Sequence, residues 1–147
     1  MAASVAALRK LTWFERRMLA ESLLLLPVTA LALRFLPLRR IRVVNDRPRR
    51  RRREPIDRAR ADRIAHMVAA AAQHGPYRAS CLPQSLVLQF LLRRDGMRGE
   101  LRYGVRKIDD AVQAHCWIEL NGEPLIDSPQ VHRHFAVLER SPSCESR

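Results

Sequence analysis

Residues 78–94, which read RASCLPQSLVLQFLLRR, carry the signals that decide the fold. Ser80 is a favoured helix cap and Pro83 suits a first helical turn, so a helix is predicted to begin at Cys81 and to continue through the apolar run. Unpaired N–H groups at a helix start favour negative charge. Cys81 is therefore a candidate nucleophile, because a thiolate is the reactive form of cysteine and is stabilised at such a position.

A candidate general base lies in residues 113–120, QAHCWIEL. Their aromatic and β-branched side chains predict a strand that ends at Asn121-Gly122, a favoured hairpin turn. Alternation along the strand puts His115, Trp117 and Glu119 on one face. His115 is the residue expected to take the proton from the cysteine.

Asp127 is the candidate for the third catalytic role, holding the histidine in its useful tautomer. A strict two-residue turn would point Asp127 away from His115, whereas a three-residue loop or a bulge near Pro124 would bring the two onto one face. The triad of Cys81, His115 and Asp127 therefore predicts a bulged or three-residue hairpin. Glu119 competes for the role, but it lies about 13 Å from His115 at 3.3 Å per residue, and is expected to be solvated or to bind peptide.

Each of these residues also fits a plain structural role. A cysteine on an apolar stretch is often a small buried hydrophobe, which is the alternative for Cys81. His115, which precedes a tryptophan on a strand, fits a hydrogen-bonded core histidine, and Asp127 fits a cap of the turn at residues 127–129.

The order of these motifs resembles the lasso peptide maturation B proteins, transglutaminase-like cysteine peptidases that remove the leader from a ribosomally made precursor. The matching segments are CLPQSL (81–86), LLRRDGM (91–97), LRYGVR (101–106) and AHCWIE (114–119). The similarity is specific from about residue 77 to residue 127, and residues 10–40 are similar in a less specific way. Gln84 stands where the family often has arginine, and Cys116 where it often has alanine. A lost arginine could alter peptide binding.

The resemblance implies that Cys81 attacks the carbonyl at the leader–core junction, with His115 as base and Asp127 as its orienter, and that water hydrolyses the thioester. The backbone N–H of Cys81 is the expected first oxyanion donor, with Tyr77 and Gln84 as candidates for the second. The implied partners are the precursor leader, a small leader-recognition protein of the RRE (PqqD-like) type, and a separate ATP-dependent lasso cyclase. No cofactor is implied.

Two other functions stay open. A catalytically idle docking protein would hold a peptide on the same fold without using the thiol. An acyltransferase or amidase would use the same Cys–His–Asp site with an amine acceptor or a small amide. The motifs alone do not separate these from a peptidase.

The cysteines and the absence of a convincing secretory signal predict reduced thiols and a cytoplasmic location. Cys81, Cys116 and Cys144 are scattered without a C-x-x-C pair, and Cys144 is expected to be an exposed bystander in a polar tail. The two histidines of residues 132–134 are weak evidence alone, so no metal site is predicted.

The net charge of +12, from 27 basic and 15 acidic residues, is concentrated in residues 39–53, which include the run Arg49–Arg53. Blocks of like charge are usually solvated, so this segment is predicted to be a linker, with docking to an acidic leader or partner as the next option. Nucleic-acid binding is not expected as the main function, because no aromatic interleaving or known motif accompanies the arginines.

The N-terminal region is predicted to be helical. Thr12 and Glu15 have capping-box spacing, so one helix should run from about Trp13 towards Pro27, with a second piece over residues 28–36. The uncharged stretch 22–33 is too short to span a bilayer, which needs about 20 residues, and membrane contact is not expected.

The predicted fold is α+β: N-terminal helices plus a papain- or transglutaminase-like core, with the Cys81 helix packed on a small antiparallel sheet. A further helix is expected between residues 57 and 75, a strand over 101–106 followed by a polar break at 107–110, and a short strand within 131–138. The expected organisation is an N-terminal helical region (1–40), an Arg-rich linker (41–56), the peptidase core (57–140) and a polar tail (141–147).

Overall fold

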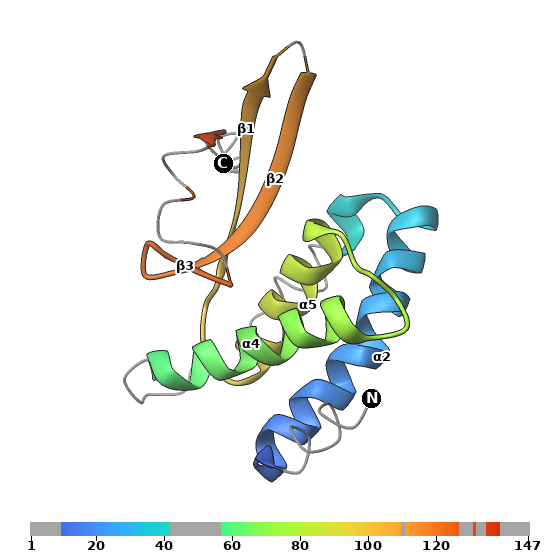
Figure 1. Cartoon of the computed structure of the whole chain (residues 1–147), viewed down its shortest axis with the longest axis vertical. Coiled ribbons are helices and arrows are strands. Elements are labelled where there is room, and N and C mark those ends of the chain that lie inside the picture. The colour runs from blue at the N-terminus through green and yellow to red at the C-terminus, as the bar shows by residue number, and fades with distance from the viewer. Residues whose placement is uncertain (1–9, 42–56, 110, 127–130, 132–134, 139–147) are drawn as a thin grey trace, which may run out of the picture.

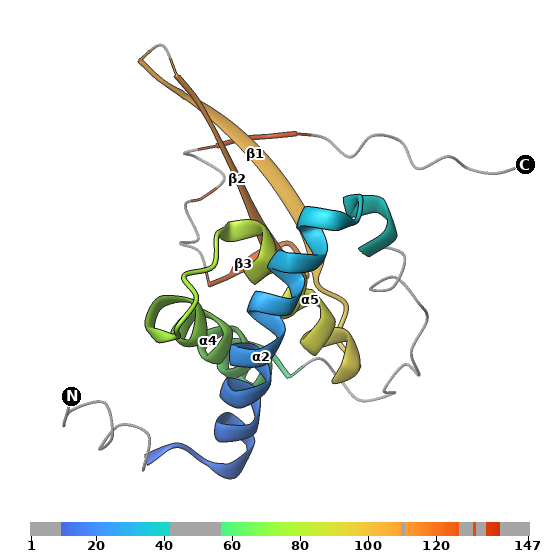
Figure 2. The same ribbon diagram turned by 90° about the vertical axis from the view of Figure 1, so that its right-hand side faces the viewer.

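The structure is a computed structural model, and it describes residues 10–41, 57–109, 111–126, 131 and 135–138. The helices defined at both ends are α2 (Trp13–Phe35), α4 (Arg58–His74) and α5 (Cys81–Arg94), and the strands are β1 (Glu100–Ile108), β2 (Ala111–Leu120), β3 (Glu123–Leu125) and β4 (Ala136–Val137). The strands form an antiparallel sheet of order β3-β2-β1-β4. The α+β prediction is confirmed. The helices pack together beside one end of the β1–β2 hairpin, whose other end projects beyond them (Figures 1 and 2).

Helix α5 is the centre of the core, because it contacts α2, α4 and the sheet. Its apolar run is buried almost throughout, as a helix surrounded on several sides requires. Helix α4, which the sequence predicted between residues 57 and 75, adds an apolar stripe of buried residues. Its start is capped by the Asp57 side chain, which accepts from the Arg60 N–H at 3.0 Å. The largest fully buried aliphatic side chains on these two helices and β2 are Ile64, Val68, Leu86, Val87, Leu88, Leu91, Leu92, Ile118 and Leu120.

Helix α2 begins with the predicted capping box, in which Thr12 and Glu15 bond to each other's backbone N–H groups. The expectation of two helical pieces is wrong, because α2 runs through Pro27 without a break. Proline removes one intrahelical bond and crowds the carbonyl four residues earlier. The helix continues because both sides of Pro27 pack on the core, with Leu26 buried before it and Leu33 partly buried after it.

By length and composition α2 meets the criterion for a membrane-spanning helix, with a mean hydropathy of 1.7 over 18 residues. A core helix or a signal sequence meets the same criterion, so this is weak evidence. One face of α2 packs against α4 and α5, and its buried Met18 and Leu26 belong to the hydrophobic core.

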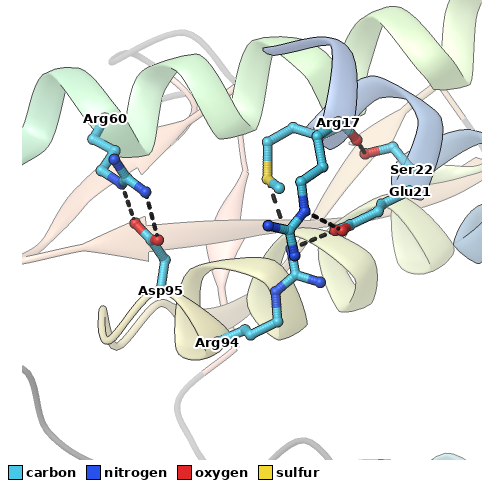
Figure 3. A network of polar contacts seen from close by, with 7 residues as sticks. Arg17, Glu21, Ser22, Arg60, Arg94 and Asp95 are labelled. Carbon is cyan, nitrogen blue, oxygen red and sulfur yellow. Dashed lines mark hydrogen bonds and ion pairs between the residues drawn. The ribbon is translucent and has the colours of Figure 1, made fainter. Parts of the chain in front are cut away.

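Two arginine–carboxylate links join the helices at the C-terminal end of α5 (Figure 3). Arg94 of α5 donates to Glu21 of α2, which also accepts from Arg17 at 2.9 Å. Arg60 of α4 forms a two-pronged pair with Asp95, the C-cap residue that follows α5. These links fix the far end of α5 against both neighbouring helices.

The polar break expected at residues 107–110 is instead a tight turn within one long hairpin. β1 continues to Ile108 and β2 begins at Ala111, and the two pair along their whole length. Asp109 adopts a left-handed conformation (φ 52°), which suits a turn. The expected strand within 131–138 is present as Ala136–Val137 on β1. The predicted linker lies almost wholly outside the described residues, as does the whole of the predicted tail, and the domain boundaries stay predictions.

Glu21→Gln tests the link between α2 and α5. Burial alone would raise the pKa of the Glu21 carboxyl, but hydrogen bonds from Arg94 and Arg17 outweigh it and hold this pKa below its ordinary value of 4.5. The stabilisation is therefore complete above about pH 4.5 and is lost as the pH falls through the lowered folded-state pKa. Urea unfolding should show that the variant loses about 0.5–1 kcal/mol at pH 7 and much less at about pH 3.

The control is Glu123→Gln, which removes the charge from a highly exposed partner of Arg58. It should change the free energy of unfolding by less than Glu21→Gln at pH 7. Equal losses for Glu21→Gln at both pH values would contradict the electrostatic origin.

Candidate active site

Cys81 is the first residue of α5, as predicted. Ser80 occupies the N-cap position in an extended conformation, although its side chain makes no capping bond. The junction is held instead by Gln84, whose backbone N–H donates to the Ser80 carbonyl (3.3 Å) and whose side-chain amide donates to the Ala79 carbonyl (2.7 Å). Helix geometry leaves the N–H groups of Cys81 and Leu82 without a carbonyl one turn earlier, so they can face an anion.

His115 lies on β2 opposite Gly104 of β1. Its ring centroid is 5.1 Å from that of Phe135 and 6.0 Å from that of Trp117, with which it stacks. Gly104 permits this packing, because a Cβ there would lie 2.7 Å from the Phe135 Cβ and 3.0 Å from two Trp117 ring carbons. Aromatic contacts on a partly buried imidazole restrict its orientation.

Cys81 and His115 line the same cavity, whose volume is about 250 Å³. Helix α5 provides one wall and β2 the other, and a bond from the buried Ser85 hydroxyl to the Cys116 carbonyl (3.3 Å) ties the walls together. The structure thus brings together the predicted nucleophile and base. The full lining is Cys81, Gln84, Ser85, Leu88, His115, Cys116, Trp117, Ile118, Leu125 and Ile126.

The expectation that Glu119 is solvated or binds peptide is wrong, because its side chain is only 6% exposed. One carboxylate oxygen accepts from the Trp117 indole N–H at 2.9 Å, and the other accepts from Arg102 at 2.9 Å. A buried indole N–H needs an acceptor, and a buried carboxylate needs a cation. Glu119 is thus bonded to Arg102 and to Trp117, the ring that stacks on His115.

The expectation of a three-residue loop or a bulge between β2 and β3 is also wrong. Asn121 (φ 55°) and Gly122 (φ 82°) form a two-residue turn, Leu120 pairs with Glu123, and the ladder stays regular to Leu125. These two residues favour positive φ, and the resulting turn matches the twist of the strands, which explains the tight connection.

Ile126 breaks the strand alternation at the next step. Its φ of 68° is left-handed, which is a strained conformation for a β-branched residue. The two-residue register therefore no longer determines the face of Asp127. Asp127 itself lies outside the described residues, so its orienting role stays a prediction.

Three residues near the cavity were missed from the sequence. Gly104 within a strand is a signal of close backbone approach that could have been used. Ser85 lies in the CLPQSL segment (81–86) that carries the family resemblance, but nothing in the sequence assigned it a bond to the histidine strand, and Phe135 had no signal, because it is distant in sequence from His115. Tyr77 and Gln84 stay candidates for the second oxyanion donor. Within the described ranges, no group of three or more His, Cys, Asp or Glu side chains is placed to hold a metal ion.

Comparison with known families gives one match. Residues 22–140 match a family model described as the transglutaminase-like superfamily. The match begins inside α2 and covers α4, α5 and the four described strands. No curated protein and no solved structure matches the chain.

Glu119→Ala tests the buried support of His115. It should lower the free energy of unfolding by about 2–3 kcal/mol in urea titrations, because it leaves a buried indole N–H without its acceptor and removes one of the two carboxylates that pair with Arg102, the other being Glu100. Glu123→Ala is the matched control, since Glu123 is an exposed carboxylate that also pairs with an arginine. The control should lower the free energy of unfolding by less than about 0.5 kcal/mol. If both variants lowered the free energy of unfolding by similar amounts, the buried bonds of Glu119 would contribute no more than an exposed ion pair.

Proposed function

The chain belongs to the transglutaminase-like superfamily, whose members are usually cysteine hydrolases or transferases, and we propose that it is a leader peptidase of lasso peptide biosynthesis. The observation that carries the proposal is the cavity shared by Cys81 at the start of α5 and His115 on β2. The sequence resemblance to lasso peptide maturation proteins supports the finer assignment of substrate.

The proposed reaction begins when His115 takes the proton from the Cys81 thiol and the sulfur attacks the carbonyl carbon at the leader–core junction. The oxyanion forms beside the backbone N–H of Cys81, which the helix start leaves available. His115 then donates its proton to the departing amine of the core peptide. A thioester remains between Cys81 and the leader.

Hydrolysis completes the cycle. Water gives a proton to His115 and attacks the thioester carbonyl, and the sulfur leaves and is reprotonated by His115. Asp127 is proposed to hold the imidazole throughout. Its neighbour Ile126 lines the cavity, which supports this assignment over Glu119, whose two oxygens are bonded to Trp117 and Arg102.

The proposed partners follow from the same resemblance. A small leader-recognition protein delivers the precursor, and an ATP-dependent cyclase joins the freed core amine to an acidic side chain. The proposed location is the cytoplasm. The large positive charge of the chain favours an acidic leader or partner.

The reactivity of Cys81 tests whether the cavity is a thiol active site. At about pH 6.5, iodoacetamide should label Cys81 faster than Cys144, and His115→Ala should remove most of that advantage, because the imidazole promotes thiolate formation. Peptide mapping by mass spectrometry measures both sites in one sample. The control is His66→Ala, which removes an exposed histidine of α4 and should leave the labelling rates of Cys81 and Cys144 unchanged. Equal labelling of both cysteines in the wild type would contradict an activated thiol.

Precursor cleavage tests the substrate. With the leader-recognition protein present, the wild type should cut the precursor into leader and core, and Cys81→Ala should abolish cleavage, a loss of at least about 10³-fold. Intact masses distinguish the chemistry, since hydrolysis adds one water across the bond whereas transfer joins two molecules. Unchanged pathway output with Cys81→Ala would identify a docking protein, and a joined product would identify an acyltransferase.

A further inference from the structure

Close to the cavity, strand β2 has a described neighbouring strand on one side only. β1 pairs with β2 over its whole length, but β3 pairs only with Ile118, Glu119 and Leu120. Among the described residues, no strand pairs with the outer edge of residues 111–114, which directly precede His115. This part of the hairpin projects beyond the helices (Figures 1 and 2), and its four side chains are exposed.

The register shows which backbone groups point outward from this edge. In a two-residue turn the residues flanking the turn bond to each other, so the backbone N–H and C=O of Leu120 face Glu123 of β3. In an antiparallel strand every second residue faces the same neighbour. The groups of Ile118 therefore also face β3, and those of Cys116, Ala114 and Val112 point to the same side.

A side-chain bond supports this assignment independently. The Cys116 carbonyl accepts from Ser85 of α5 on the cavity wall, so it does not face β1. Ala114 and Val112 then offer an N–H and a C=O each to whatever lies along the edge. These groups start one residue from His115 and extend about 10 Å from it, at 3.3 Å per residue.

We propose that the outer edge of Val112 and Ala114 binds the substrate as an added β-strand and guides it into the Cys81–His115 cavity. This inference rests on the proposed function. The occupant is an extended peptide segment, because an unpaired strand edge binds extended backbone and this edge runs directly to the cavity. We assign it to the segment N-terminal to the scissile bond, which stays attached to Cys81 in the thioester while the core leaves.

Recognition of this kind uses main-chain bonds, so it depends little on the side chains of the peptide. It can therefore be tested without knowing the precursor. The probes are two chloromethyl ketones with the same reactive group, acetyl-alanyl and acetyl-tetra-alanyl. In each, the Cys81 thiolate forms a C–S bond and displaces chloride. Only the longer reagent reaches along the edge.

The measured quantity is the ratio of the two labelling rates at Cys81, long reagent over short. The wild type should give a ratio of about ten, the effect expected of two main-chain hydrogen bonds. Val112→Pro removes an outward N–H and should reduce the ratio to about two or less. Lys107→Pro is the matched control: Lys107 pairs with Val112, so its N–H points outward from the opposite edge, and the ratio should stay near ten.

A modified reagent gives the same test without changing the protein. N-methylation of the internal amides of the tetra-alanyl reagent should bring its rate of labelling Cys81 in the wild type down to about that of the short reagent, a ratio of about one. This result would support the proposal even if Val112→Pro failed to fold.

Three outcomes would overturn the proposal. The first is a wild-type ratio near one with Cys81 still labelled rapidly by the short reagent, which leaves the proposed function intact. The second is an equal loss in Val112→Pro and Lys107→Pro. The third is a wild-type dimer, seen by size exclusion, that Val112→Pro converts to a monomer, since the edge would then pair with a second copy. Slow labelling of Cys81 by every reagent would instead show that the proposed function fails.

Discussion

The burial of α5 is the constraint on which the rest of the structure depends. This helix contacts α2, α4 and the sheet, so its direction is fixed by apolar packing on several sides. The position of Cys81 follows, because it is the first residue of a helix whose next turns are buried in the core. The Ser85 bond to the Cys116 carbonyl then sets the spacing between the cysteine helix and the histidine strand.

The two ends of α5 differ in a way that suits a reactive site. At its C-terminal end, Arg94 and Asp95 are bonded to side chains of α2 and α4. At its N-terminal end the Ser80 side chain makes no capping bond, and Cys81, whose N–H has no carbonyl one turn earlier to bond, lines the cavity. Rigid anchoring at one end keeps the open end in place, which general acid–base chemistry requires.

The sequence predicted the elements whose signals are local. The capping box at Thr12 is found as predicted, and so is the helix start at Cys81, although the Ser80 side chain does not make the capping bond. Two of the errors arose where tertiary packing decides. Packing on the core lets α2 continue through Pro27. Glu119 is buried beside Trp117, and its carboxylate accepts a hydrogen bond from the Trp117 indole N–H.

The site was predictable to the same extent. The placement of Cys81 at a helix start and of His115 on a strand could be predicted, because both depend on local sequence signals. The structure shows that the two residues line one cavity. The contact between His115 and Phe135 was not readable, since it depends on the chain crossing to the far edge of the sheet and on the space left by Gly104. The left-handed Ile126 was equally unpredictable, because β-branched residues rarely adopt that conformation.

The buried pairing of Glu119 with Arg102 has a consequence for how the protein responds to salt. Charges on its strongly basic surface are screened over about 10 Å at 0.1 M ionic strength, so attraction to acidic molecules weakens as salt is added. In the Glu119–Arg102 pair the Glu119 side chain is only 6% exposed and the Arg102 side chain 33%, so this partly buried pair is screened less than the surface charges. Ionic strength can therefore change how quickly an acidic molecule is attracted without loosening the aromatic packing around His115.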